Sequence, residues 1–225
     1  DNAIAWYENA PDNTAPTVSS VSSSTSDGSY NLDDVIAITI TFSESVTVSG
    51  TPQLTLETGS SDAVVNYSSG SGGSVITFNY TVASGHTSSD LDYKATSSLA
   101  LNSGTIRDAA GNNATLTLAS PGASNSLGAN KAIIIDTTIP TMVITATNGS
   151  SAVNDGATSN DGTLTMTFTS SEATSNFAVG DISVSGGAMS NFSASSSTVY
   201  TATFTPSGDA TYTIGVTSGS FADVA

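Results

Sequence analysis

The chain has 225 residues, 37% of them hydrophobic, which is enough apolar material for one or two domains with a real core. Its formal net charge is −16, because 19 acidic residues stand against only Lys94, Arg107 and Lys131. This charge argues against nucleic acid and anionic membrane surfaces as partners, and it favours divalent cations. The absence of cysteine excludes disulfides and thiol catalysis. The sequence contains no run of about 18 apolar residues, so no membrane-spanning segment is predicted.

Alternation of apolar and polar residues predicts a first series of short β-strands. The clearest is residues 35–42 (VIAITITF), which place Ile36, Ile38, Ile40 and Phe42 on one face, as in a strand with one buried side. Further strands are predicted at residues 53–58, 63–69, 74–82, 114–119 and 131–136.

A second series of alternating stretches follows. It comprises residues 141–147, 162–169, 181–187, 198–206 and 210–218. Many short strands separated by Gly, Ser and Asn turns are typical of antiparallel sandwiches. No stretch predicts a helix, so the expected fold class is all-β.

Three short motifs occur once in each series. DNTAP (12–16) returns as DTTIP (136–140), TFSESV (41–46) as TFTSSEAT (167–174), and IRDAAGN (106–112) as FADVA (221–225). The repetition predicts two sandwiches in tandem.

The predicted domains are a first sandwich over residues 12–138 and a second over residues 139–225, after an extension of residues 1–11. The first copy continues past its DAAGN motif with NNATLTLA and KAIIID, whereas the second stops at FADVA. We therefore expect the second sandwich to lack its last strand.

The repeated motifs carry acidic residues at equivalent positions. In a sandwich whose strands run alternately down and up, these positions fall at one pole. The sequence thus predicts two converging sets, Asp12, Glu44 and Asp108 in the first copy and Asp136, Glu172 and Asp223 in the second. Such hard oxygen donors suit Ca²⁺, which takes six to eight oxygen ligands.

Other side chains could complete these sites, and simpler roles stay open for the acids. Asn112 or Asn13 could add a carbonyl ligand. Asp90 and Asp92 are expected at the opposite pole of the first copy, where they could complete the junction site around Asp136. Alternatively, the acids shape tight turns and Asx turns, or Asp108 pairs with the neighbouring Arg107.

DTTIP, FSE and DAAGN, with GTPQLTLETG and SSDLDY in the first copy, resemble the motifs of tandem bacterial immunoglobulin-like (Ig-like) repeats over residues 12–225. Such repeats occur in large calcium-dependent adhesins and in other surface or secreted proteins. The resemblance implies Ig-like sandwiches, calcium at or near domain junctions, and an extracellular or cell-surface location. Separately, IAWYEN (4–9) resembles the closing strand of a propeller-type repeat.

The favoured function is a non-catalytic structural or adhesive segment of a bacterial surface protein, stiffened by Ca²⁺. Catalysis is not expected, because the single histidine, His86, comes without a G-x-S-x-G nucleophile elbow. The partners expected are neighbouring domains or copies of the same chain.

Two other functions fit the same residues. In a filament subunit, residues 2–9, with Ile4, Trp6 and Tyr7, would be a donor strand that fills the open groove of the next molecule's second sandwich. Against this, the chain could be a fragment of a longer protein. A carbohydrate-binding accessory module of a secreted hydrolase, with surface glycans as its partner, is the third possibility.

Overall fold

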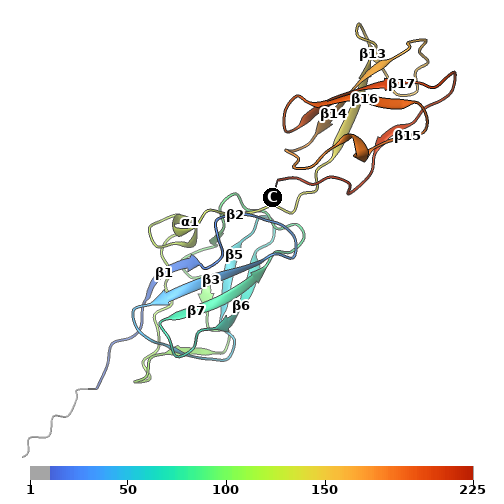
Figure 1. The fold of residues 1–225 in the computed structure, drawn as a ribbon. Helices are drawn as coiled ribbons and strands as arrows, with labels where there is room; N and C mark the ends of the chain where they lie inside the picture. The colour runs from blue at the N-terminus through green and yellow to red at the C-terminus, as the bar shows by residue number, and fades with distance from the viewer. Residues whose placement is uncertain (1–10, 225) are drawn as a thin grey trace, which may run out of the picture. The chain divides into compact units, whose positions relative to one another are not determined.

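The computed structural model describes residues 11–224, which separate into two compact units. The first unit ends at Thr137, and the second covers Thr138–Val224. Both units consist almost entirely of short strands joined by turns (Figure 1). Among the described residues, no helix is both long and apolar enough to cross a membrane.

The main sheet of the first unit is antiparallel throughout. Its strands in spatial order are β1 (Val18–Ser23), β3 (Val35–Phe42), β7 (Val75–Thr81), β6 (Ala63–Ser69), β5 (Gln53–Glu57) and β8 (Asp92–Tyr93), and β9 (Leu99–Ala100) also pairs with β5. The predicted strands at 35–42, 53–58, 63–69 and 74–82 all belong to this sheet.

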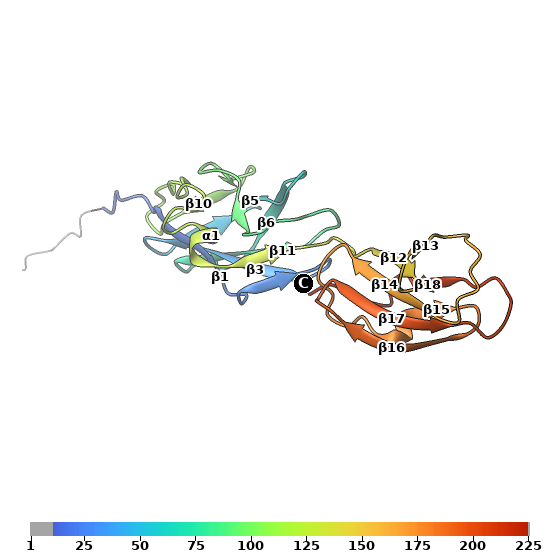
Figure 2. The same cartoon turned by 90° about the horizontal axis from the view of Figure 1, so that it is seen from above.

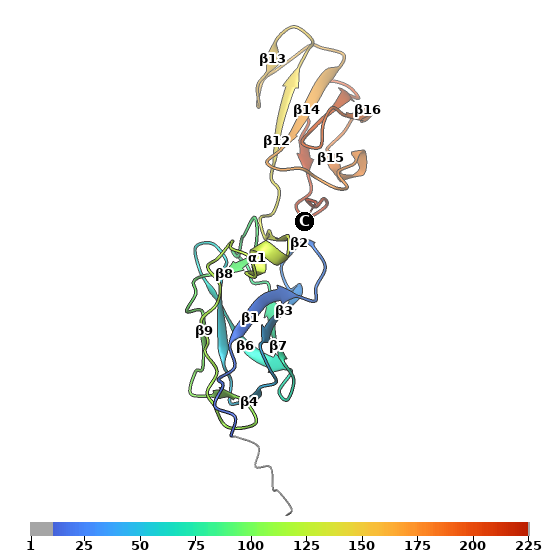
Figure 3. The same cartoon turned by 90° about the vertical axis from the view of Figure 1, so that its left-hand side faces the viewer.

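Two small pairs close the ends of the first unit (Figure 3). At one end, β4 (Thr47–Ser49) pairs antiparallel with β10 (Thr105–Arg107). At the other end, β2 (Gly28–Tyr30) pairs with β11 (Ile133–Ile135), and this pair is parallel. The parallel pair departs from the purely antiparallel sheets that the sequence predicts.

The segment between β10 and β11 corrects two sequence predictions. Residues 114–119 form only isolated contacts, because Thr115 donates its N–H to the Pro16 carbonyl whereas Leu118 donates to the Thr96 carbonyl. Two such different partners leave no continuous ladder, so the predicted strand is absent. A helix that the sequence did not predict, α1 (Leu127–Asn130), follows, and four residues are too few to produce a periodic pattern.

The core of the first unit confirms the alternation seen in the sequence. Ile36, Ile38 and Ile40 are fully buried and Phe42 is 2% exposed. The segment after β10 also contributes to this core through Leu118, Leu127, Ile133 and Ile135. Burial of the whole apolar face of β3 explains why this strand reads so clearly from sequence.

The second unit is built from one larger and one smaller sheet (Figure 2). The larger sheet has the order β13 (Ala152–Val153), β12 (Met142–Thr147), β14 (Leu164–Ser170), β17 (Val199–Thr205) and β16 (Ala188–Ala194). The smaller pairs β15 (Ile182–Val184), which follows a single 3-10 turn, η1 (Val179–Asp181), with β18 (Ile214–Val216). All pairs in this unit are antiparallel.

An aromatic cluster centred on Phe177 holds the second unit together. The ring of Phe177 lies 5.0–5.9 Å, centroid to centroid, from the rings of Tyr200, Phe221, Phe192 and Phe168. Most of these contacts are edge-to-face, the arrangement that aromatic quadrupoles favour. The cluster joins the larger sheet to the loop before β15, through Phe177, and to the segment after β18, through Phe221.

Replacing Ile38 by Ala should open a cavity in the first unit and lower the free energy of unfolding there by about 2–5 kcal/mol. Hydrogen exchange of the amides in β3 and β7, where Ile38 lies opposite Phe78, measures the change. The matched control is Val64→Ala, because Val64 is 57% exposed and its loss should cost about 0.5 kcal/mol or less. Equal effects of the two variants would contradict the assignment of this face to the core.

Candidate metal site

The first set of acidic residues lies where three segments of the first unit meet. Asp12 precedes β1, Glu44 follows β3 and Asp108 follows β10. β1 and β3 are antiparallel with Val18 opposite Phe42, so the chain entering β1 lies beside the chain leaving β3. The sheet register therefore fixes two of the three segments.

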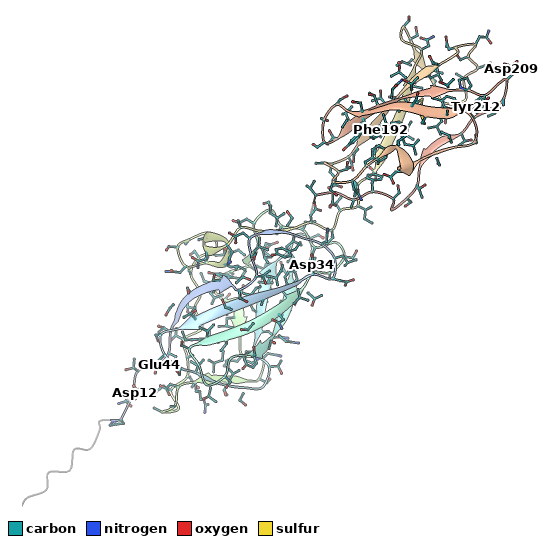
Figure 4. The ribbon with its side chains drawn as sticks, viewed as in Figure 1. Asp12, Asp34, Glu44, Phe192, Asp209 and Tyr212 are labelled. Carbon is teal, nitrogen blue, oxygen red and sulfur yellow. The ribbon has the colours of Figure 1, made fainter. Side chains whose placement is uncertain are left out.

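Side-chain and backbone bonds hold the segments in place. The Ser43 N–H donates to the Thr17 carbonyl at 2.8 Å, and the Thr17 N–H donates to the Ser43 hydroxyl at 3.0 Å. Figure 4 shows Asp12 and Glu44 at the same end of the unit and Asp34 at the other end.

The three carboxylates converge. One oxygen each from Asp12, Glu44 and Asp108 lies within 4.8 Å of the other two. Ca²⁺–oxygen distances are about 2.3–2.6 Å, so oxygens bound to one calcium ion are at most about 5 Å apart. The spacing of the three oxygens therefore fits a single shared cation.

Asp108 is the buried member of the set, at 5% exposure. One of its oxygens accepts the Asn112 backbone N–H and the other accepts the Asn112 side-chain N–H, both at 2.7 Å. Burial by itself raises the pKa of Asp108, but hydrogen bonds from the side chain of Asn112 and from the backbone of Asn112, Gly111 and Ala110 outweigh it and lower the pKa. Gly111, at φ +95°, makes this loop possible.

Asn112 also ties the loop to the entering chain. Its side-chain nitrogen donates to the Asp12 carbonyl at 3.0 Å and to the Thr14 carbonyl at 3.4 Å. The structure therefore shows Asn112 as a hydrogen-bond donor beside the site, whereas the sequence suggested it as a carbonyl ligand. Asp12 also accepts the Thr14 N–H at 2.9 Å, which is the Asx turn considered from sequence.

Glu44 is the carboxylate that the cluster disfavours in its charged form. Its pKa is raised by desolvation and by the negative charges of Asp12 and Asp108. A cation that bound all three carboxylates would remove this repulsion, which makes binding stronger as Glu44 loses its proton with rising pH.

The three basic residues make their interactions elsewhere. Lys94 pairs with Asp62, and the Lys131 ammonium lies 3.7 Å from Asp27. Arg107 donates to the Asn113 side chain at 2.8 Å instead of pairing with Asp108. The negative charge of the set is therefore not balanced by a salt bridge among the described residues.

The second set is assembled in part within the second unit. One carboxylate oxygen of Glu172 lies within 4.8 Å of one of Asp223. Asp223 is 9% exposed and forms an isolated β-bridge with Thr174. Asp136 belongs to the first unit, where it follows β11 and donates its N–H to the Tyr30 carbonyl, so its place in this set stays a prediction.

Two family models, each described as a bacterial Ig-like domain, match residues 12–122 and 136–225. The chain belongs to the bacterial Ig-like domain family. It carries two such domains in tandem, as the repeated motifs predict, and each matched range begins at the aspartate of the first motif. A search of curated proteins found no match to the chain. Bacterial Ig-like domains are typically non-catalytic structural modules of surface or secreted proteins.

Asp90 and Asp92 lie in the first Ig-like domain, apart from the set of Asp12, Glu44 and Asp108. Asp92 is buried and accepts the N–H groups of Tyr93 and Gly122, so it holds the loop before α1. Asp90 is exposed, and its pKa is raised by desolvation and by Asp92. Because Leu91 donates its N–H to the Ile133 carbonyl, both acids lie several residues along β11 from Asp136.

Sequence reasoning missed the role of Ser43 in the first Ig-like domain. Its hydroxyl accepts the Thr17 N–H and fixes the chain between the first motif and β1. The serine lies next to Glu44 inside the FSE motif, and Ser171 accepts the Thr141 N–H at the equivalent position of the second Ig-like domain. Recurrence of this serine beside the glutamate was the signal available in the sequence.

Replacing Asp12 by Asn removes one of the two charges that raise the pKa of Glu44, while the Asn side-chain oxygen can still accept the Thr14 N–H. We expect the pKa of Glu44 to fall toward its ordinary value in an NMR titration of the glutamate carboxyl carbons.

The control for this titration is Asp33→Asn, which changes the same charge at the turn before β3. β3 has eight residues, or roughly 26 Å, which exceeds the Debye length of about 10 Å at 0.1 M salt. The pKa of Glu44 should not change in this control. An unchanged pKa in the Asp12 variant would contradict the coupling between the carboxylates.

Proposed function

We propose that this chain is a structural segment of an extracellular bacterial surface protein, in which Ca²⁺ stiffens the poles of the Ig-like domains. The observation that carries the proposal is the convergence of Asp12, Glu44 and Asp108, for which residues 11–224 offer no basic partner. Membership of the bacterial Ig-like family supports the structural role and the surface location.

The chemistry of the donor set favours calcium over other metals. The chain has no cysteine, and its single histidine, His86, follows β7, whose last residue Thr81 lies opposite Val35 at the far end of β3. A site of carboxylate oxygens alone suits Ca²⁺ or Mg²⁺. Asp12 is exposed, so water can supply further ligands, and the irregular geometry of three loop carboxylates suits the adaptable coordination of Ca²⁺.

An ion at this position would link three segments that hydrogen bonds connect only in part. Asn112 already donates hydrogen bonds to the Asp12 carbonyl and the Asp108 carboxylate. The Glu44 carboxylate, by contrast, is repelled by the negative charges of Asp12 and Asp108. The bound ion would replace this repulsion with attraction and would hold the chain that enters β1 in one direction. Fixing the direction of the entering chain is what a rigid spacer requires.

The second domain is proposed to bind calcium in the same way. Glu172 and Asp223 are already neighbours, and Asp136 is their partner by equivalence to Asp12. Residues 12–122 and 136–225 each match a family model described as a bacterial Ig-like domain, and Asp12 and Asp136 stand at the start of the two matches.

The environment of His86 supports a non-catalytic role. Its Nδ1 lies 2.9 Å from the hydroxyl of Tyr80 and accepts the Ala83 N–H at 3.4 Å. These contacts close the loop after β7. The backbone of His86 is held as well, because the Thr137 hydroxyl donates to the His86 carbonyl. The histidine thus has a structural task in the chain.

The test is thermal unfolding of the chain with and without millimolar calcium, followed by titration calorimetry. Calcium should stabilise the wild-type chain, by about 2.7 kcal/mol when its concentration is 100 times the dissociation constant. Glu44→Gln should lose the heat of one binding event and the stabilisation of the first domain, because the uncharged amide cannot replace the carboxylate.

Glu57→Gln is the matched control, since Glu57 is an exposed glutamate at the end of β5. Its calcium response should equal that of the wild type. A chain whose unfolding does not respond to calcium, or a Glu44 variant that responds fully, would refute calcium at this site.

A further inference from the structure

The second domain leaves one side of its core open. Met142, Ile144 and Ala146 of β12 pack against the core, as do Ile214 and Val216 of β18, yet all five remain partly exposed. In the first domain, by contrast, inward residues of the main sheet such as Val21 and Ile40 are fully buried. Partly exposed apolar residues on the inner side of two strands mark a place where a further element fits.

The first domain shows which element fits there. β11 lies between β2 and residues 88–91, because it pairs with β2 in parallel and exchanges hydrogen bonds with Ser88 and Leu91. Ile133 and Ile135 of β11 point into the core and are at most 2% exposed. α1 packs against β1 and adds Leu127 to the same side of the core.

The equivalent position in the second domain is flanked by unpaired strand edges. Residues 88–91 come seven to ten residues after the end of β7, and residues 212–215 come at the same interval after the end of β17. Among the described residues, β13 pairs only with β12 and β18 pairs only with β15. No described segment of the second domain takes the place of residues 114–135.

We propose that the open side of the core between β12, β13 and β18 forms a groove that binds residues 2–9 of a second copy of the chain as a β-strand. These residues lie outside the described part of the structure, but their sequence, NAIAWYEN, matches the chemistry of β11. In an extended strand Ile4 and Trp6 share one face, as Ile133 and Ile135 do. Strand addition of this kind combines backbone pairing with pockets for alternate side chains.

We take the occupant from a second copy, because the chain enters the first domain and leaves it at opposite ends of β3. Asp12 is bound at the end of β3 that carries Glu44. The chain leaves the first domain at Thr137, which is bound to Gly85 near the opposite end of β3.

Docking between copies would be head to tail, with the first residues of one molecule in the second domain of the next. A contact of this type does not close on itself unless its rotation makes a ring, so it produces open chains. Each copy has a net charge of −16, so the copies repel one another and association should strengthen as salt screens the charge.

The single tryptophan provides a direct test, since Trp6 is in the proposed donor strand. In sedimentation velocity, the sedimentation coefficient of the full chain should rise with concentration as copies associate. The fluorescence emission of Trp6 should shift to shorter wavelength at the same time. Ile4→Asp should weaken association by about tenfold or more, because it buries an unpaired charge. Ala10→Asp makes the same charge change outside the strand and should associate as the wild type does.

Crosslinking locates the groove, because the chain has no cysteine of its own. A chain with Ala5→Cys should crosslink through a short bismaleimide to a second chain with Val153→Cys on β13. It should not crosslink to one with Ser193→Cys on β16, the opposite edge of the same sheet.

A monomeric chain at every concentration and salt, with an unchanged Trp6 spectrum, would refute the proposal. Crosslinking to β16 in place of β13 would also refute it, because the strand would then extend the other edge of the sheet. Association that survives Ile4→Asp would show that the copies meet through another surface.

Discussion

The antiparallel ladder of β1, β3 and β7 is the constraint on which the first domain depends. β3 is its central strand, and the complete burial of Ile36, Ile38 and Ile40 sets the register, because a slip of one residue would turn this face toward water. With the register fixed, the end of β3 lies beside the start of β1. The position of Glu44 next to the chain that contains Asp12 is therefore a consequence of apolar packing, and the carboxylates themselves oppose it.

The carboxylate cluster shows two opposite solutions for buried or crowded charge. Asp108 is stabilised in its charged form by hydrogen bonds from its own loop, which lower its pKa despite burial. Glu44 has a raised pKa, because desolvation and the negative charges of Asp12 and Asp108 disfavour its ionised form. In this cluster the charge of Asp108 is already stabilised by hydrogen bonds, whereas the charge of Glu44 is destabilised by its surroundings. A bound divalent ion would relieve the destabilisation of Glu44.

The two domains repeat the same motifs, yet they complete their cores differently. The first domain inserts β11 beside β2 and covers β1 with α1, whereas the second relies on the aromatic cluster around Phe177 and leaves β12 partly exposed. A sheet with an unpaired edge and an apolar inner side is a natural acceptor for another strand. The partly exposed β12 and the unpaired edge of its sheet therefore make the second domain the candidate for strand addition.

The sequence by itself determined the all-β fold, the two tandem domains and most strands of the main sheets, because burial of one strand face imposes period-two alternation that is visible in residues such as 35–42. It also placed Asp12, Glu44 and Asp108 at one pole, since the direction of alternating strands follows from their number. Only the tertiary structure decided that β11 runs parallel to β2, that residues 114–119 form no strand, and that Asn112 donates hydrogen bonds toward the site. These features depend on partners distant in the chain, and local alternation carries no information about which partner a backbone group will find.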